Sequence, residues 1–175
     1  MEYIDDQDIM NEIIFEPIVN EEEWERRKLF VGFGQNDREI LQELHLFANA
    51  YADEIMDELY HRWLQMFELV RFFPDNDMLI RVKKMQKEYF ISLTKGEYGR
   101  DYLMNRLHIG KVHKKIGLSP RWYIGSYAIY MELVLPKVLR AFEYHRDKQK
   151  NAIIALVKII SLDQELALVS YFGKQ

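Results

Sequence analysis

The chain has 175 residues, a net charge of −4 and no cysteine. This length suits one domain, since chains of ~100 to 200 residues normally close around a single core, and it leaves no room for a second catalytic domain. The interspersed charges form no basic stripe of the kind that binds nucleic acid, and no apolar run approaches the ~18 residues of a membrane span. The lack of cysteine excludes disulfides, thiolate metal sites, iron-sulfur clusters and covalent haem attachment.

Residues 1–19 are predicted to form an acidic tail that is at best partly ordered, because Pro17 blocks a long helix there. The tail lacks the basic region and apolar segment of a signal peptide, which predicts a cytoplasmic protein. Residues 20–175 are predicted to form one all-α domain. Their prolines and glycines lie mostly between periodic apolar segments, and β-branched alternation is rare.

The first helices of this domain follow from local signals. A short helix is predicted over 21–29. Asn36 and Glu39 resemble a capping box that opens a helix over 37–48. A second apolar stripe follows Asn49. The chain there either bends within one continuous helix or breaks into two separate helices.

Four longer helices are predicted in the rest of the domain, over 76–95, 100–116, 121–144 and 147–171. Asp75 or Asn76 caps the first of them, and Ser119 with Pro120 begins the third. Pro136 lies inside the third helix and predicts a kink.

The last helix is apolar around most of its circumference, more than packing on one side requires. The residues responsible are Ile153, Ile154, Leu156, Val157, Ile159 and Ile160. Two explanations are open: a partner helix from a second subunit, or complete burial of this helix in the core of its own chain.

His113 lies on an apolar face of the helix predicted over 100–116. Residues three and four positions away share that face, and they include Ile109, Gly110 and Ile116. A planar apolar group could lie flat against such a face, with Gly110 leaving room for close approach. Neutral imidazole is a usual axial ligand of haem iron, so haem ligation is one interpretation, and a core histidine bonded to the backbone is the other.

The other histidines are weaker candidates for a metal site. His108 lies ~140° around the helix from His113, on the side of two lysines, and is expected to face solvent. His45, His61 and His145 have no second histidine at the spacing of zinc ligands, so no zinc site is expected.

Tyr60 lies in a strongly apolar segment, where a buried phenol needs a hydrogen-bond partner. A diatomic gas could supply that partner, because a phenolic hydroxyl stabilises the partial negative charge on bound O2 and does little for CO. The alternative is an ordinary core tyrosine bonded to a carbonyl. Trp122 and Tyr123, at the start of the next helix, either wall the proximal side of the same pocket or belong to the core.

No signature of a hydrolase, a metalloprotease or a phosphate-binding loop occurs, since G-x-S-x-G, H-E-x-x-H and G-x-x-x-x-G-K are all absent. Asp53 and Asp57 share a helix face, but they are expected to face water. Lys83, Lys84 and Lys87 interrupt an apolar stripe and are expected to be solvated, with contact to a haem propionate open for one of them.

One segment resembles a known family. The pattern R-L-H-I-G-x-V-H-x-x-I-G-L-x-P-x-W-Y-x-G, from Arg106 to Gly125, resembles the proximal-histidine segment of the globin-coupled sensors, the haem domains of bacterial aerotaxis-transducer-like proteins. The upstream D-E-L-Y, ending at Tyr60, resembles the family's helix B, whose tyrosine faces bound oxygen. The resemblance covers about 24–172. Protoglobins are near relatives, but their tryptophan before the distal tyrosine is Leu59 here, which favours the sensor branch.

The resemblance implies a globin-like helical sandwich with an extra N-terminal helix and a reduced helix D. It implies one b-type haem whose iron is held by His113, with Tyr60 as the distal donor. It also places Val82 and Met85 on the distal wall. Ile109 and Ile116, which share the face of His113, and Tyr123, just after it, are expected on the proximal side.

The implied function is gas sensing, principally of O2, with CO and NO as further candidate ligands. The resemblance also implies a homodimer built from the last two helices, and a signalling output domain or partner protein. The domain itself is not expected to be an enzyme. Two alternatives stay open: a single-domain redox globin that acts on O2 or NO, and a haem-free globin scaffold that serves as an interaction module.

Overall fold

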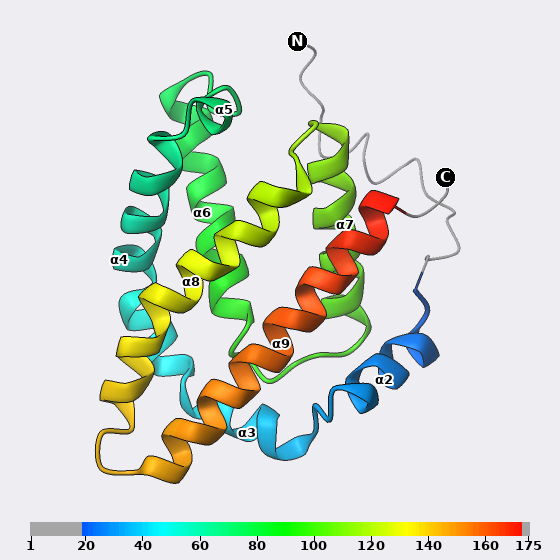
Figure 1. The fold of residues 1–175 in the computed structure, drawn as a ribbon, viewed down its shortest axis with the longest axis vertical. Helices are drawn as coiled ribbons and strands as arrows, with labels where there is room; N and C mark the ends of the chain where they lie inside the picture. Colours follow the sequence, from blue (N-terminus) through cyan, green and yellow to red (C-terminus); the bar gives the residue numbers. More distant parts are fainter. Residues whose placement is uncertain (1–18, 173–175) are drawn as a thin grey trace.

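The computed structural model describes residues 19–172, which fold into eight helices without a strand among those residues (Figure 1). The helices are α2 Glu21–Phe30, α3 Gln35–Glu43, α4 His45–Leu64, α5 Phe67–Val70, α6 Asn76–Ser92, α7 Arg100–Lys115, α8 Pro120–Ala141 and α9 Arg146–Phe172. The all-α prediction is confirmed. The predicted acidic tail lies outside the described residues, except for Val19, which is fully buried.

Two helices begin where the sequence predicts, because a side chain at each N-terminus accepts a hydrogen bond from the first turn. Oδ1 of Asn20 accepts one from the backbone N–H of Glu23 at 2.8 Å, and Oδ1 of Asp75 accepts one from that of Met78 at 2.7 Å. These bonds satisfy donors that have no partner within the helix. Pro120 occupies the first turn of α8, where its missing N–H costs nothing.

The N-terminus of α3 lies two residues earlier than predicted. Oδ2 of Asp37 accepts a 2.8 Å hydrogen bond from the backbone N–H of Gly34, which is one half of a capping box, so Gly34 and Asp37 cap the helix rather than Asn36 and Glu39. Glycine donates its N–H as well as any residue does, but without a side-chain oxygen it is hard to recognise as a cap from the sequence.

The break after α3 also differs from the prediction. It lies at Leu44, not at Asn49, so the helix predicted over 37–48 is wrong in its second half. Asn49 is inside α4, where its amide donates a 2.8 Å hydrogen bond to the carbonyl oxygen of His45. Leu44 is 3% exposed, and its burial in the core fixes the corner between the two helices.

α6 ends at Ser92 rather than at the predicted Lys95. Oγ of Ser92 donates to the carbonyl oxygen of Tyr89 at 2.5 Å, and Oγ1 of Thr94 donates to that of Ile91 at 3.0 Å. Such local bonds compete with the helical ladder and favour a turn.

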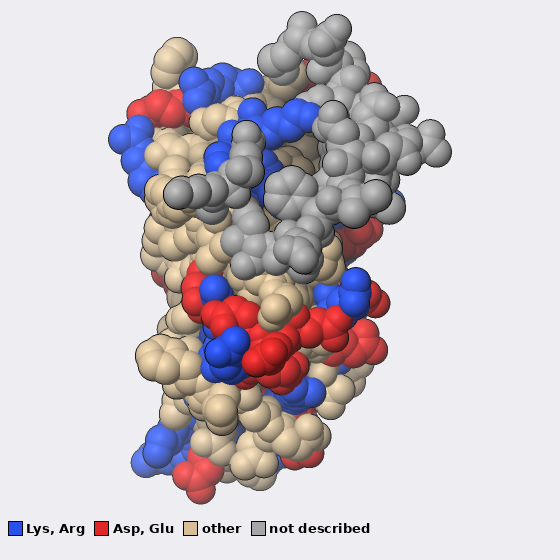
Figure 2. Space-filling view, turned by 90° about the vertical axis from the view of Figure 1, so that its right-hand side faces the viewer, with Lys and Arg blue, Asp and Glu red and all other residues tan. Residues whose placement is uncertain are grey.

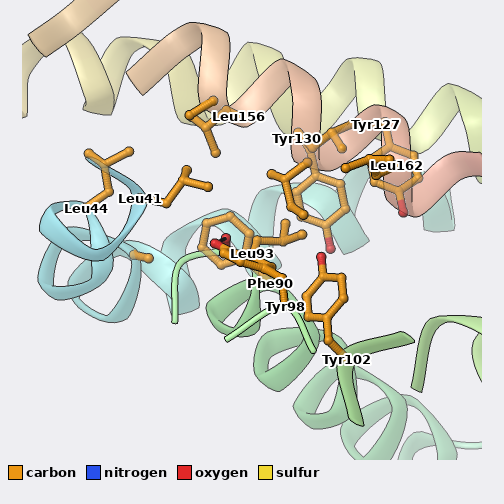
Figure 3. Close-up of a cluster of buried hydrophobic side chains, with 14 of the residues drawn as sticks. Leu41, Leu44, Phe90, Leu93, Tyr98, Tyr102, Tyr127, Tyr130, Leu156 and Leu162 are labelled. Carbon is orange, nitrogen blue, oxygen red and sulfur yellow. Dashed lines mark hydrogen bonds between the residues drawn. The ribbon is translucent and has the colours of Figure 1, made fainter. Parts of the chain in front are cut away.

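The long helices pack in a sandwich around a mixed aliphatic and aromatic core. α9 packs against α7, α3 and α8, while α4 packs against α6 and α8. α8 and α9 run diagonally side by side across the molecule in Figure 1. Figure 3 shows the centre of the core, to which α3, α6, α7, α8 and α9 all contribute: Leu41, Leu44, Phe90, Leu93, Tyr98, Tyr102, Tyr127, Tyr130, Leu156 and Leu162.

α9 is buried on one face and partly exposed on another. Leu162 and Leu166 are fully buried against its neighbours, whereas Ile154 and Val157 remain 40% and 49% exposed. Burial within this chain therefore explains most of the apolar excess predicted for this helix. It leaves a smaller apolar strip, including these two side chains, uncovered.

Charges of both signs lie side by side on the face shown in Figure 2, which is the side of α2, α7 and α9. Arg27 on α2 reaches Glu165 on α9 at 2.7 Å, and Lys158 on α9 reaches Asp37 on α3 at 3.0 Å. These ion pairs tie neighbouring helices together. Among the described residues, no helix is both long enough and apolar enough to cross a membrane.

Gly110 allows α7 to approach α9 closely. A Cβ atom at this position would lie 2.7 Å from the carbonyl oxygen of Ala167 and 2.7 Å from Cβ of Ser170. The space beside Gly110 is therefore filled by α9, and the prediction that this glycine leaves room for a planar ligand is wrong. Oγ of Ser170 donates a 3.0 Å hydrogen bond to the carbonyl oxygen of Leu107 across the same contact.

Gly110→Ala is expected to lower the free energy of unfolding by about 1–3 kcal/mol, because the added methyl group must separate two packed helices. Gly125→Ala is the matched control, since Gly125 also lies in a helix and a Cβ there would have no described neighbour within 4 Å. Gly125→Ala should raise the free energy of unfolding by about 0.5–1 kcal/mol, because alanine favours a helix more than glycine does. Urea denaturation measures both changes, and equal effects would contradict the role assigned to Gly110.

Candidate functional site

His113 lies in the last turn of α7, and its imidazole is neutral at pH 7. Nδ1 is buried and has no hydrogen-bond partner in the described part of the chain. Burial lowers the pKa of His113 to about 4. The ring of Tyr123 lies beside it, with centroids 5.1 Å apart. Such an imidazole can hold a metal through one ring nitrogen.

Tyr60, in α4, carries a second unsatisfied polar group. The residue is 3% exposed, and its hydroxyl has no hydrogen-bond partner among residues 19–172. Burial raises the pKa of Tyr60, so the phenol keeps its proton and remains a donor. Its ring lies among those of Trp63 and Phe73, with centroids 5.0 and 5.7 Å away. Because buried polar groups nearly always find a partner, this free donor points to a ligand.

Trp63 is a further candidate that the sequence reasoning did not assign. Its Nε1 is buried and, like the Tyr60 hydroxyl, lacks a partner within the described residues. A tryptophan three positions after Tyr60 shares its helix face, so the spacing carried a signal that the two rings lie together. Indole N–H groups only donate, which makes Trp63 a second potential donor beside Tyr60.

Arg106 of α7 contacts α6 at Ser92 and at the ring of Tyr89, and α6 and α7 are not among the closely packed helix pairs of the described chain. Nη2 of Arg106 donates a 2.7 Å hydrogen bond to Oγ of Ser92.

The other predicted wall residues differ in exposure. Val82 and Ile109 are half-buried, Met85 and Ile116 are 54% and 44% exposed, and Tyr123 is buried. Exposed apolar side chains are available for a ligand to cover. Their contact with a cofactor stays a prediction.

Asp53 and Asp57 are exposed, as predicted, and pair with lysines of α6. Oδ1 of Asp53 lies 2.7 Å from Nζ of Lys87, and Oδ1 of Asp57 contacts Nζ of Lys83. These pairs bridge α4 and α6 at the surface. Lys83 and Lys87 were predicted to be solvated surface lysines, and each of them also pairs with a carboxylate.

A buried ion pair lies on the inner side of α7. Asp163 of α9 is fully buried, and its Oδ2 accepts a 3.0 Å hydrogen bond from Nε of Arg106, which is 3% exposed. Tyr89 donates to the same oxygen at 2.7 Å, and Tyr102 donates to Oδ1 at 2.5 Å. Arg106 also stacks on both rings, with its Cζ 4.3 and 3.9 Å from their centroids.

The tyrosines continue from Asp163 toward His113. The hydroxyl of Tyr89 contacts that of Tyr127, which lies 2.7 Å from the hydroxyl of Tyr123. Burial, and next the negative charge of Asp163, raise the pKa of Tyr89, while burial is the largest cause at Tyr123 and Tyr127. All three phenols are therefore neutral at pH 7.

Local charge keeps Arg106 protonated. Burial alone would lower the pKa of Arg106, but the attraction of Asp163, followed by that of the surrounding tyrosines, outweighs it and raises the pKa. In the sequence, Arg106 stands out only as part of a motif, and Asp163 does not stand out. The available signal was an acid at 163 in a mostly apolar helix, with Glu165 two positions later.

Gln86 lies beside Met85 on α6, and the sequence left it unassigned. Its Nε2 donates a 2.7 Å hydrogen bond to the hydroxyl of Tyr130. Burial raises the pKa of Tyr130, and smaller contributions come from both Tyr60 and Tyr123. The bond between Gln86 and Tyr130 therefore ties α6 to α8.

The side chains present fit a haem. A neutral imidazole without a partner and a phenol that can only be satisfied by an added acceptor are the donor set that a haem and its gas ligand require. The described residues contain no group of three or more His, Asp or Glu side chains that could hold a different metal ion.

Comparison with known proteins identifies the family. The protein family model described as Protoglobin matches residues 20–175. The heme-based aerotactic transducer HemAT of Halobacterium salinarum is 26% identical over an alignment of 155 residues, and the match covers 83% of this chain and 32% of that protein. This chain thus spans about a third of the length of that relative.

A solved structure agrees in fold. The globin domain of the Geobacter sulfurreducens globin-coupled sensor superposes with a TM-score of 0.81 at 22% identity, over 85% of this chain and 97% of that domain. The globin-like helical architecture and the resemblance to globin-coupled sensors, both predicted from the sequence, are confirmed. Since the family model covers nearly the whole described chain, the chain belongs to the protoglobin family.

Proposed function

We propose that this chain is a haem-based gas-sensing domain that responds mainly to O2. The observation that carries the proposal is the pair of unsatisfied buried groups, Nδ1 of His113 and the hydroxyl of Tyr60, within a globin fold. The similarity to a protein named a heme-based aerotactic transducer supports it.

The residues would lie on the two sides of a b-type haem, whose iron binds O2, CO and NO reversibly. His113 would hold the iron through Nε2, because its neutral ring keeps a lone pair free at pH 7. Tyr60 would donate a hydrogen bond from its hydroxyl to O2. Val82 and Met85 would form the distal wall, and Ile109, Ile116 and Tyr123 would form the proximal wall.

Signalling would pass through the helices that leave the pocket. Ile154 and Val157 of α9 and Leu139 of α8 are 40–49% exposed, which suits apolar contacts with a second copy. Residues 20–175 would form the sensor. The last two helices of two copies would then form a four-helix bundle, whose repacking reaches an output domain or partner protein.

Absorption spectra of the purified chain after haem reconstitution test the proposed function. We expect a Soret band that changes position under N2, O2 and CO. A chain that remains without a Soret band would reject haem sensing and would favour the interaction-scaffold alternative. Steady consumption of NO or O2 with an added reductase would instead favour the redox alternative.

Tyr60→Phe is expected to speed O2 release by about 10- to 100-fold, because the phenol donates a charge-assisted hydrogen bond worth about 1.5–3 kcal/mol. CO release should change far less, since CO carries little negative charge. Stopped-flow ligand replacement measures both rates. Tyr98→Phe is the control, because its hydroxyl is bonded to the carbonyl oxygen of Leu93 at 2.7 Å. Equal acceleration of O2 and CO would contradict the distal role.

A further inference from the structure

We infer that the indole N–H of Trp63 and the hydroxyl of Tyr60 donate hydrogen bonds to the same bound gas molecule, so that Trp63 is a second residue that determines ligand specificity. The inference rests on the proposed function, which it deepens by naming a further residue that selects O2 against CO. One helix, α4, would then supply both donors.

The indole N–H of Trp63 is a buried donor that the described chain leaves without a partner. Trp24 shows the usual arrangement in this protein, because its Nε1 donates a 2.8 Å hydrogen bond to the carbonyl oxygen of Tyr98 in the core. An indole N–H can only donate, and a buried donor without an acceptor is unfavourable. A bound acceptor would therefore stabilise Trp63 where it lies.

Trp63 and Tyr60 are neighbours on one face of α4. They lie three positions apart in the helix, and their rings are in contact, with centroids 5.0 Å apart and planes inclined by 53°. The hydroxyl of Tyr60 could have accepted from the indole, yet it too has no partner in the part of the chain that the structure describes. Both donors are therefore free, and one acceptor that reaches the pair satisfies both.

The nearest described side chains supply no acceptor to this pair. Phe73, whose ring centroid lies 5.7 Å from that of Tyr60, is apolar. Arg62, next to Trp63 in the sequence, is itself a donor, and its Nη1 donates to Glu132 of α8 at 2.7 Å. This bond ties the turn of α4 that carries Trp63 to α8.

Two donors that reach one ligand select that ligand by its charge. Bound O2 carries partial negative charge, whereas bound CO carries little. Hydrogen bonds to a charged acceptor are roughly twice as strong as bonds between neutral groups. The indole of Trp63 should therefore slow the release of O2 and leave the release of CO nearly unchanged.

Trp63→Phe tests the inference, because it removes the N–H and keeps an aromatic ring beside Tyr60. In the haem-loaded chain, O2 release should become about 2- to 10-fold faster, as expected for the loss of one hydrogen bond, while CO release changes little. Phe73→Leu is the matched control, since it alters the packing around Tyr60 without removing a donor. This control should change both rates by the same factor. Equal acceleration of O2 and CO in Trp63→Phe would contradict the inference.

The same substitution in a Tyr60→Phe background separates a direct donor from a residue that only holds Tyr60 in place. A direct donor still bonds to O2 when the hydroxyl of Tyr60 is gone, so Trp63→Phe should speed O2 release in this background as well. No further acceleration there would mean that Trp63 acts only through Tyr60, and the inference would be rejected.

NMR of the wild-type chain gives a readout that needs no rate measurement. The ferrous O2 and CO complexes are both diamagnetic, so their ¹H–¹⁵N spectra can be compared directly. The indole proton of Trp63, whose signal is the one absent in Trp63→Phe, should lie at lower field in the O2 complex. The indole proton of Trp24 is the internal reference, because its bond to Tyr98 is the same in both. Equal positions of the Trp63 signal in the two complexes would overturn the inference.

The outcomes distinguish this inference from the proposed function. A wild-type chain that binds no haem would reject both together. A chain that binds haem and O2, but whose O2 release and spectra show no contribution from Trp63, would reject this inference alone.

Discussion

Alanine at His113 is expected to abolish specific haem retention, so that the reconstituted variant lacks the Soret band of the wild type. His113 supplies a neutral imidazole on α7. Without this imidazole, apolar contacts alone would have to hold the haem. Absorption spectra after gel filtration measure the loss.

His108→Ala is the control for this experiment. His108 lies on the same helix and is exposed, as predicted, so its removal should leave the Soret band unchanged. Circular dichroism should show the same helix content in both variants, because the Nδ1 of His113 makes no hydrogen bond that the fold would lose. Full haem retention by His113→Ala would contradict the assigned ligand.

Asp163→Ala is expected to lower the free energy of unfolding by about 3–5 kcal/mol, because it leaves the buried charge of Arg106 without its partner. The two residues are 0% and 3% exposed, so water cannot replace the lost carboxylate without opening the core. The hydroxyls of Tyr89 and Tyr102 lose their acceptor as well. Chemical denaturation measures the change.

Two comparisons show whether burial causes this loss. Glu43→Ala removes one partner of a pair with Lys148 whose side chains are 45–46% exposed, and it should cost only about 0–1 kcal/mol. Replacing both buried partners, as Arg106→Met with Asp163→Leu, should cost less than the sum of the single changes. A loss for Asp163→Ala no larger than that for Glu43→Ala would reject the buried-pair assignment.

The sequence predicted the helices best where a local signal marks their ends. Asn20, Asp75 and Pro120 each stand at the beginning of a helix in the structure. The prediction failed at Leu44, where the chain turns because a leucine is buried in the core. No local pattern distinguishes such a corner from a continuous helix.

The residues of the candidate site, like the helices, were predicted from the sequence only in part. The spacing around His113 and the resemblance of its segment singled out this residue and Tyr60, and the structure leaves both without partners. Gly110 was misinterpreted, because a glycine on an apolar face can admit a ligand or a neighbouring helix equally well. In the structure, α9 fills the space beside Gly110, so this glycine admits a neighbouring helix.

By itself, the sequence determined the all-α class, the family and the two polar residues of the candidate haem pocket. These follow from periodicity and from a motif, which are local in the chain. Only the tertiary structure decided which polar groups meet in the core. Asp163 lies 57 residues from Arg106 and 74 from Tyr89 along the chain. Packing of α9 against α7 brings Asp163 to Arg106, and Tyr89 reaches the same carboxylate from α6. Local patterns give the buried face of each helix, whereas partners in the core depend on how whole helices pack.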